Sequence, residues 1–184
     1  MAVIREGNKA ALLIVDVQVG VVREAWNTPQ VVENINLAVE KARAGGMPVI
    51  WVQHADEELI YGSPKWQLVP QLSPADEDLH FYKSYNSSFE ETALEEILAE
   101  LGVTHIVLAG AATNWCIRAT AYAALDRGYD LTLIKDAHTT EMMEFQDGTI
   151  IEADYIIRDL NVAMTWLSYP GRSNSAVPAA ELEF

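Results

Sequence analysis

The chain has a single cysteine, Cys116, among its 184 residues, and it lacks any long apolar run. One cysteine cannot form an internal disulfide, and it cannot supply a cysteine-rich zinc site. A membrane-spanning helix needs about 18 or more consecutive apolar residues, so we expect no membrane segment. No small-residue cleavage site follows the apolar run near the N-terminus. We therefore expect no export signal and a reducing, cytoplasmic location.

Basic residues are also few, with 12 Lys and Arg against 27 Asp and Glu, which gives a formal net charge of −15. These basic residues are scattered, so the phosphate backbone of a nucleic acid would be repelled. An anionic membrane surface is disfavoured for the same reason. Acidity of this degree is most simply a contribution to solubility. We expect a small-molecule substrate as the partner, with no nucleic acid and no membrane.

Short apolar runs alternate with amphipathic segments along the whole chain. The expected strands lie at residues 10–15, 47–54, 80–83, 104–110 and 130–137. The expected helices lie at residues 29–45, 87–102, 114–128 and 149–160. Such alternation is typical of an α/β fold in which helices cover both faces of a parallel sheet. Residues 162–168 fit either a last strand or a continued helix, and the strand is favoured. We expect one domain over 1–184, with 169–184 as an irregular arm.

Two stretches carry local signals. Ser88 stands near the start of the helix expected at 87–102, and Glu91 follows three residues later, in the spacing of a capping box. Residues 55–79, in contrast, show no regular period and contain Gly62 and three prolines. A loop of this length in a compact domain usually acts as a lid or a binding loop.

Polar residues follow the expected strands at the points where those strands end. In a parallel α/β sheet, the chemistry lies outside the carboxyl ends of the strands. The candidate residues are therefore Asp16, His54, Lys83, the turn 110–116 and Asp136. A carboxylate at the end of an apolar strand is costly to desolvate unless a positive group such as Lys83 compensates it.

Cys116 lies where the turn leads into the expected helix, and two interpretations of it remain open. A free cysteine is most often a small buried residue. In the first turn of a helix, however, free backbone N–H groups and the helix dipole would stabilise a thiolate nucleophile. Asp16 could then accept the thiol proton, Lys83 could favour the thiolate, and amides of the turn could bind an oxyanion. The spacing of these residues alone does not establish such a site.

Three blocks of the sequence resemble the isochorismatase-like cysteine hydrolases: ALLIVDVQ, KSYNSSFEETALEEILAELGVTHIVLAG and AATNWCIRATAYAALDRGYDLTLIKDAHTT. This superfamily includes nicotinamidases, N-carbamoylsarcosine amidases, ureidoacrylate amidohydrolases and isochorismatases. The resemblance extends from Lys9 to Thr140, and more weakly to Leu167. It rests on Asp-x-Gln after the first strand, on Lys followed by Ser-x-Phe, and on Thr-x-x-Cys followed by Thr-Ala.

The resemblance implies a catalytic triad of Asp16, Lys83 and Cys116. It also implies a cis peptide bond between Ala111 and Ala112, and an oxyanion hole formed by the backbone amides of Ala112 and Cys116. The implied fold is a three-layer α/β/α sandwich around a six-stranded, mainly parallel sheet in the order 3-2-1-4-5-6. Members of the family usually form homodimers or homotetramers, so we expect a homo-oligomer.

One departure from the family concerns metal binding. Nicotinamidases hold a metal with an Asp-x-His pair after the second strand and a further histidine in the next loop. Here Val52 stands two residues before His54, where the carboxylate ligand would be, and His80 is too near Lys83 to fill the missing place. A zinc site needs at least three good ligands. We therefore expect no metal, no other cofactor and no nicotinamidase activity.

The expected function is hydrolysis of a C–N bond in a small amide, carbamoyl or ureido substrate through a thioester at Cys116. Isochorismatases that cleave a vinyl ether generally lack this cysteine, which favours amide-type hydrolysis. Two alternatives remain open: a vinyl-ether hydrolase that uses Asp16 without the cysteine, and a catalytically silent binding or redox protein. The residues expected to bind substrate are Gln18, Tyr85, Asn86, Phe89 and Trp115.

Overall fold

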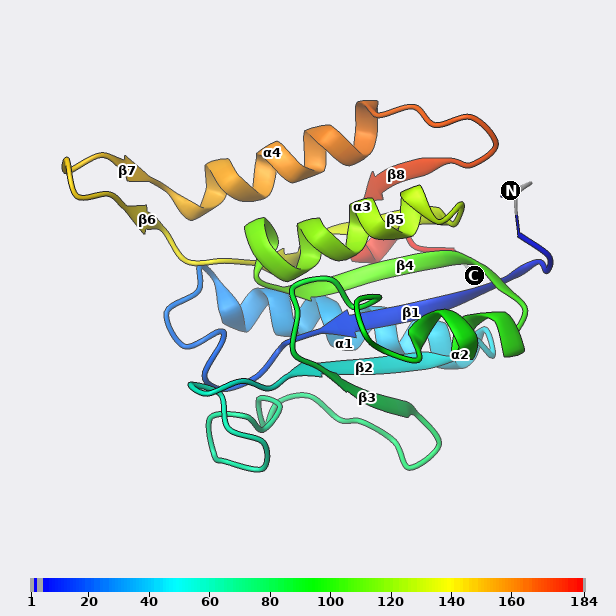
Figure 1. Cartoon of the computed structure of the whole chain (residues 1–184), viewed down its shortest axis with the longest axis horizontal. Helices are drawn as coiled ribbons and strands as arrows, with labels where there is room; N and C mark the ends of the chain where they lie inside the picture. The colour runs from blue at the N-terminus through cyan, green and yellow to red at the C-terminus, as the bar shows by residue number, and fades with distance from the viewer. Residues whose placement is uncertain (1, 3–4, 184) are drawn as a thin grey trace.

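The apolar runs of the sequence form one parallel sheet in the computed structural model, which describes residues 2 and 5–183. Its strands are β1 (Lys9–Val15), β2 (Val49–His54), β3 (Leu79–Lys83), β4 (Val103–Ala111), β5 (Asp130–Thr139) and β8 (Asn174–Val177). They lie in the order β3-β2-β1-β4-β5-β8, and every neighbouring pair is parallel (Figure 1). Their carboxyl ends therefore lie at one edge of the sheet.

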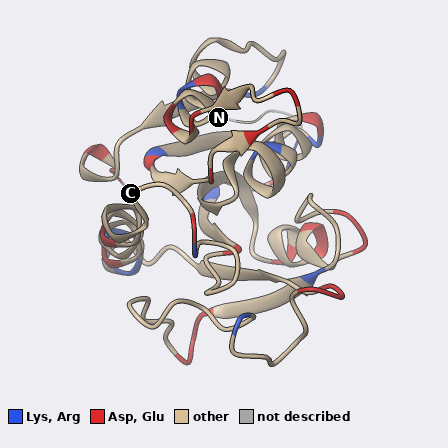
Figure 2. Ribbon diagram, turned by 90° about the vertical axis from the view of Figure 1, so that its left-hand side faces the viewer, with Lys and Arg blue, Asp and Glu red and all other residues tan. Residues whose placement is uncertain are grey.

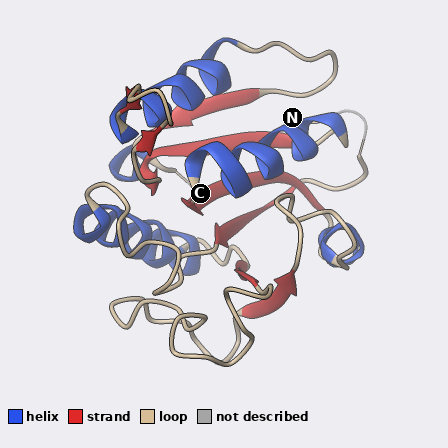
Figure 3. Ribbon diagram, turned by 60° about the vertical axis from the view of Figure 1, so that its left-hand side comes forward, coloured by secondary structure: helices blue, strands red, loops and turns tan. Residues whose placement is uncertain are grey.

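Helices cover both faces of this sheet (Figure 3). They are α1 (Thr28–Ala44), α2 (Leu94–Glu100), α3 (Arg118–Asp126) and α4 (Ala153–Trp166), with a π-helical turn η1 (Thr113–Ile117) directly before α3 and a 3₁₀ turn η2 (Ala179–Glu181). A short antiparallel hairpin, made of β6 (Met143–Glu144) and β7 (Ile150–Ile151), stands outside the sheet. The predicted three-layer architecture and strand order are confirmed, with β8 as the sixth strand.

Side chains that alternate along the strands build a core on each face of the sheet. In β1, Leu13 and Val15 join the cluster that includes α2, α3 and α4, whereas Leu12 and Ile14 join the cluster that includes α1. Each of these four side chains is at most 1% exposed. Because β1 lies in the middle of the sheet and is covered on both faces, its run is apolar at every position rather than at alternate ones.

The C-terminal part of the chain differs from its prediction in two elements. The strand predicted at 162–168 is wrong: α4 continues to Trp166, because Leu160 and Met164 extend its buried stripe at helical spacing. The last strand of the sheet is instead β8, inside the segment 169–184 for which the sequence predicts an irregular arm. Every residue of β8 is only partly buried, so it lacks the apolar run that marks the central strands.

The helix predicted at 87–102 is shorter than expected and begins only at Leu94. Ser88 does not cap it, because the Ser88 N–H donates a 3.0 Å hydrogen bond to the hydroxyl of Thr120 on α3. Glu91 adopts a left-handed φ of 50°, so the capping-box geometry is not formed. A tertiary contact with α3 thus replaces the local helix-start signal.

Acidic residues are spread over the helices and loops, and basic residues do not gather at one place on the ribbon (Figure 2). The net charge of −15 is thus distributed over the molecule. Over residues 2 and 5–183, this arrangement forms no basic track of the kind that follows a phosphate backbone. None of the helices in those same ranges has the length and apolarity needed to cross a membrane.

The loop 55–78 between β2 and β3 contains no helix or strand, as predicted, and Asp78 fixes its end. The Asp78 carboxylate accepts hydrogen bonds from Arg43 on α1, from Trp51 Nε1 on β2 and from the backbone N–H of Ala75. Burial raises the pKa of Asp78, but these donors outweigh it and hold the pKa below its ordinary value. The chain therefore enters β3 while tied to α1 and β2.

Replacing Asp78 with Ala should lower the free energy of unfolding at pH 7 by about 2–3 kcal/mol, because Arg43 and Trp51 lose a charged acceptor. The folded-state pKa of Asp78 is depressed, so its contribution is complete above the ordinary value of 3.8 and is lost as the pH falls below it. Urea unfolding of both proteins across this pH range measures the difference. A stability gap that stays constant down to pH 3 would contradict this role.

Candidate active site

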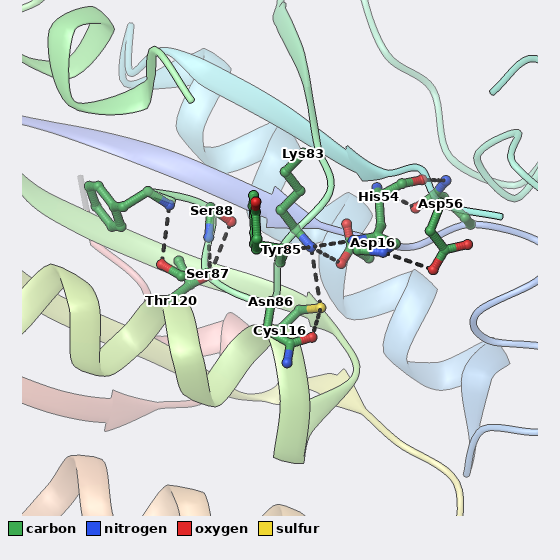
Figure 4. Close-up of polar contacts among 12 residues, drawn as sticks. Asp16, His54, Asp56, Lys83, Tyr85, Asn86, Ser87, Ser88, Cys116 and Thr120 are labelled. Carbon is green, nitrogen blue, oxygen red and sulfur yellow. Dashed lines mark hydrogen bonds and ion pairs between the residues drawn. The ribbon is translucent and has the colours of Figure 1, made fainter. Parts of the chain in front are cut away.

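Three predicted residues from separate parts of the chain meet at the carboxyl edge of the sheet (Figure 4). Asp16 follows β1, Lys83 ends β3, and Cys116 lies in the π-helical turn after β4. The Lys83 Nζ lies 2.7 Å from Asp16 Oδ2 and 3.2 Å from Cys116 Sγ. The three residues are 1%, 2% and 9% exposed, respectively. An acid, an amine and a thiol are therefore in mutual contact and shielded from water.

Unusual backbone conformations lie beside this group, where β1 and β4 end. Asp16 has a φ of 53°, in the left-handed region that costs a non-glycine residue about 1 kcal/mol. Gly110 has a φ of 126°, and a Cβ at this position would lie 2.0 Å from the Val15 carbonyl oxygen. Only glycine permits this approach of β4 to β1. The Ala111–Ala112 peptide bond that follows is cis.

The turn that carries Cys116 is braced by His138, which is 1% exposed. The His138 Nδ1 lies 2.9 Å from the Thr113 hydroxyl, and Nε2 lies 3.0 Å from Asn161 Oδ1 on α4. Asn161 Nδ2 donates to the Lys135 carbonyl, so Asn161 Oδ1 is an acceptor and His138 Nε2 carries the proton. The Thr113 hydroxyl then donates to Nδ1. Burial lowers the pKa of His138 to about 4, so the imidazole stays neutral near pH 7.

The buried ion pair of Lys83 and Asp16 has further polar partners. Lys83 Nζ lies 3.1 Å from the Tyr85 carbonyl oxygen and 3.3 Å from His54 Nδ1. Two charges removed from water need such additional hydrogen bonds, because their mutual attraction alone does not offset the lost hydration. Asp16 Oδ1, in contrast, accepts no hydrogen bond from the described residues. One carboxylate oxygen is therefore left to receive a proton.

Burial also sets the proton affinities of the acid and the thiol. It raises the pKa of Asp16, although the Lys83 charge opposes the shift. It raises the pKa of Cys116 to about 12, with the Asp16 charge acting in the same direction and Lys83 against it. The resting thiol is therefore protonated at neutral pH, so the stabilisation that the first turn of a helix would give a thiolate does not prevail in the resting protein. Asp16 is a stronger base here than a carboxylate in water.

Asp16, His54 and Cys116 each offer one possible metal-ligand atom, and these atoms lie within 4.8 Å of one another. The Lys83 ammonium contacts all three, at 2.7, 3.3 and 3.2 Å. The protein thus places its own cation among these ligands, so the set does not fit a metal ion while Lys83 remains there. Val52, which stands at the carboxylate-ligand position of the nicotinamidase pattern, is an apolar residue buried within β2.

Three residues predicted to bind substrate border the site. Trp115 directly precedes Cys116 and is 52% exposed, and Tyr85, whose carbonyl oxygen accepts from Lys83, is 41% exposed. Asn86 is exposed, and its Oδ1 lies 3.8 Å from the Cys116 sulfur. Their positions suit substrate contact, which stays a prediction.

The other two residues predicted to bind substrate are held elsewhere. Gln18 is completely buried, and its amide donates to the carbonyls of His54 and Trp66 and accepts from the His54 N–H. Phe89 is 6% exposed, and its ring packs on Tyr129 with 5.7 Å between the ring centroids. The polar amide satisfies buried backbone groups, and the apolar ring joins the core. We therefore no longer expect substrate contact from either residue.

The sequence places His54 at the active edge of the sheet but does not reveal its contact with Lys83. His54 and Lys83 are direct partners in the register of β2 and β3. Knowledge of this strand pairing would have been needed to predict their contact. His54 Nε2 lies 3.1 Å from Asp56 Oδ2, a residue that sequence analysis does not single out. Asp136, the remaining candidate, instead accepts a hydrogen bond from the Ala179 N–H in the C-terminal segment.

A sequence model of the isochorismatase domain matches residues 10–159, a range that includes all three clustered residues. The chain belongs to the isochorismatase family. The superfamily expected from the sequence blocks is thereby confirmed. A crystal structure of an isochorismatase from Pseudomonas putida KT2440 matches this isochorismatase-family fold with a TM-score of 0.84 and 27% identity, over 96% of this chain and 93% of that one.

Three further proteins have amino-acid sequences similar to that of this chain. The isochorismatase family protein YrdC of Bacillus subtilis (strain 168) is 33% identical over 152 residues, which cover 79% of this chain and 81% of YrdC. Streptothricin hydrolase of Streptomyces noursei is 31% identical over 71% of this chain and 54% of its own length. The ureidoacrylate amidohydrolase RutB of Klebsiella pneumoniae subsp. pneumoniae is 31% identical over 60% of each chain. The alignments thus span between half and two thirds of these two enzymes.

Replacing Lys83 with Met should destabilise this isochorismatase-family protein by about 3–5 kcal/mol, because Asp16 would remain as an unpaired buried charge. The double variant Asp16→Asn/Lys83→Met should recover most of this loss, since no charge is left in the site. Chemical unfolding of the wild type, both single variants and the double variant provides the double-mutant cycle. Strictly additive losses would show that the two side chains do not interact.

The protonated thiol should react slowly with iodoacetamide in the absence of substrate. At pH 8 we expect Cys116 to react at least about 100-fold more slowly than a free cysteine of pKa about 8.5, with the rate still rising at pH 10. Mass spectrometry of the intact protein follows the reaction, because the chain has no other thiol. A rate that levels off near pH 8.5 would instead indicate an ordinary, solvated cysteine.

Proposed function

We propose that the protein hydrolyses a C–N bond in a small amide, carbamoyl or ureido substrate through a thioester at Cys116. The observation that carries this proposal is the position of the Lys83 ammonium, 2.7 Å from the Asp16 carboxylate and 3.2 Å from the Cys116 sulfur. Acid, amine and thiol are the groups that a cysteine nucleophile needs for its activation. Their burial keeps water from competing for the same hydrogen bonds.

In the first half of the proposed reaction, Asp16 takes the thiol proton while the Cys116 sulfur attacks the substrate carbonyl carbon. A C–S bond forms, and the carbonyl electron pair moves to oxygen. We assign the resulting oxyanion to the backbone amides of Ala112 and Cys116. The oxyanion then collapses, the C–N bond breaks, and the amine or ammonia leaves with the proton that Asp16 returns.

In the second half, a water molecule enters after the amine has left. Asp16 removes one proton from this water as the oxygen attacks the thioester carbonyl. Collapse breaks the C–S bond, and Asp16 returns the proton to the Cys116 sulfur. The net reaction consumes one water and yields a carboxylic or carbamic acid with an amine or ammonia. Each acid–base step of this type typically contributes about 10²–10⁴-fold to the rate.

The high pKa of the thiol determines when this chemistry occurs. A free thiolate would be rare in the resting protein, because burial raises the pKa of Cys116 to about 12. Proton transfer to Asp16 therefore accompanies the attack on the carbonyl, when the negative charge passes on to the substrate oxygen. The Lys83 ammonium balances the charge throughout, since it contacts both the carboxylate and the sulfur.

The relatives support the substrate class. Streptothricin hydrolase and ureidoacrylate amidohydrolase are both hydrolases by name, and the second acts on a ureido compound. We extend this class, and no individual compound, to the present chain. Two further predictions remain: a cytoplasmic location, which follows from the single cysteine and the lack of an export signal, and a homodimer or homotetramer, which the resemblance implies.

An ammonia-release screen over small amides, carbamoyl compounds and ureido compounds should find a substrate for the wild type. Replacing Cys116 with Ala should lower turnover at least about 10⁴-fold, as expected for loss of a nucleophile. Trp115→Phe is the matched control, because it changes the neighbouring exposed residue while leaving the sulfur in place; it should change KM more than kcat.

Circular dichroism and a thermal melt should show that the Cys116→Ala variant is folded. Turnover of an amide by this folded variant at the wild-type rate would overturn the thioester mechanism. A vinyl-ether substrate cleaved equally by wild type and variant, with no amide turned over by either, would replace the proposal with the Asp16-only alternative.

A further inference from the structure

The Lys83 ammonium has more acceptors around it than it has protons. It carries three N–H groups, and its nitrogen lies near Asp16 Oδ2, the Tyr85 carbonyl oxygen, Cys116 Sγ and His54 Nδ1. A protonated thiol is a weak acceptor. In the resting state, the carboxylate, the carbonyl and the imidazole are therefore the best partners for the three protons. Among the side-chain acceptors around the ammonium, His54 is the one that the proposed chemistry does not otherwise use.

The imidazole of His54 is held in the tautomer that this contact requires. An ammonium only donates, so His54 Nδ1 must accept and Nε2 must carry the ring proton. Asp56 Oδ2 lies 3.1 Å from Nε2 and accepts that proton's hydrogen bond. The other oxygen, Asp56 Oδ1, accepts from the backbone N–H groups of Glu58 and Leu59. The carboxylate is thereby fixed at the start of the long loop.

The backbone of His54 is fixed as well. The buried amide of Gln18 accepts from the His54 N–H at 2.9 Å and donates to the His54 carbonyl at 3.0 Å. Gln18 lies two residues after Asp16, so one short segment carries the carboxylate and also positions the histidine. Both the main chain and the ring of His54 are therefore held by hydrogen bonds.

We propose that His54, oriented by Asp56, is a positioning residue that holds the Lys83 ammonium between Asp16 and Cys116. Its Nδ1 accepts the third ammonium proton. Because this hydrogen bond persists as negative charge develops on the sulfur, the ammonium stays beside the thiolate. The catalytic role of His54 rests on the proposed function, whereas the contacts by which it holds Lys83 belong to the free protein.

The test compares three variants by the rate at which iodoacetamide alkylates Cys116. The titratable side chains that face the ammonium are Asp16, His54 and Cys116, with Asp56 behind the imidazole. His54→Ala removes the acceptor, whereas His54→Asn restores an oxygen on the same γ carbon as Nδ1. His105→Ala is the matched control, since it removes a half-buried histidine near the opposite ends of the strands.

His54→Ala should slow alkylation about 10-fold at a fixed pH, the size expected for the loss of one hydrogen bond to a charged group. The whole pH–rate profile should move to higher pH, because the ammonium is held less firmly beside the sulfur. His54→Asn should recover most of the rate, and His105→Ala should match the wild type. Thermal melts should show that all three variants remain folded.

A His54→Ala profile identical to the wild type, or a faster one, would overturn the inference. So would a His54→Asn profile that is as slow as His54→Ala in a folded protein. Alkylation needs no substrate, so these outcomes are independent of the amide screen. Failure to find any turnover in the wild type would count against the proposed function alone, and a substrate found there should show a kcat loss in His54→Ala with little change in KM.

Discussion

The contact between the Lys83 ammonium and the Asp16 carboxylate is the interaction on which the site depends. Neither charge could stay buried without the other, because an unpaired ion inside a protein loses its hydration and gains no compensating attraction. The ammonium also reaches the Cys116 sulfur, at 3.2 Å. Negative charge that moves from the carboxylate to the sulfur therefore remains beside the same cation. A fixed cation of this kind needs no reorganisation during a reaction.

The scaffold places these groups on or directly beside regular elements. Parallel strands bring Asp16 and Lys83 to the same edge of the sheet, and the π-helical turn brings Cys116 over them. Neighbouring features hold each part in place: Gly110 lets β4 approach β1, and His138 joins the cysteine turn to α4. Sites built on regular elements are held more firmly than sites on loops. The long loop contributes chiefly the Asp56 carboxylate.

Much of this arrangement could be predicted from the sequence. The apolar run of β1 predicts a strand that is buried on both faces. The polar residues at the ends of the predicted strands indicate where the reactive group lies. Long-range contacts were harder to foresee. Ser88 has the local signature of a helix cap, but its bond to Thr120 decides its conformation. Phe89 looks like a pocket residue until Tyr129 is known to lie beside it. Partly buried β8 carries too weak a pattern to mark it as a strand.

The burial of the only thiol has a consequence for how this cysteine withstands oxidants. Peroxides and disulfides attack the ionised form of a cysteine, and redox-sensing cysteines are accessible and of low pKa. Cys116 is 9% exposed and holds its proton at neutral pH. Oxidative stress that converts low-pKa cysteines to sulfenic acid would therefore leave this one largely in its reduced form. The low-dielectric surroundings of the proposed nucleophile thus also protect its thiol from oxidation.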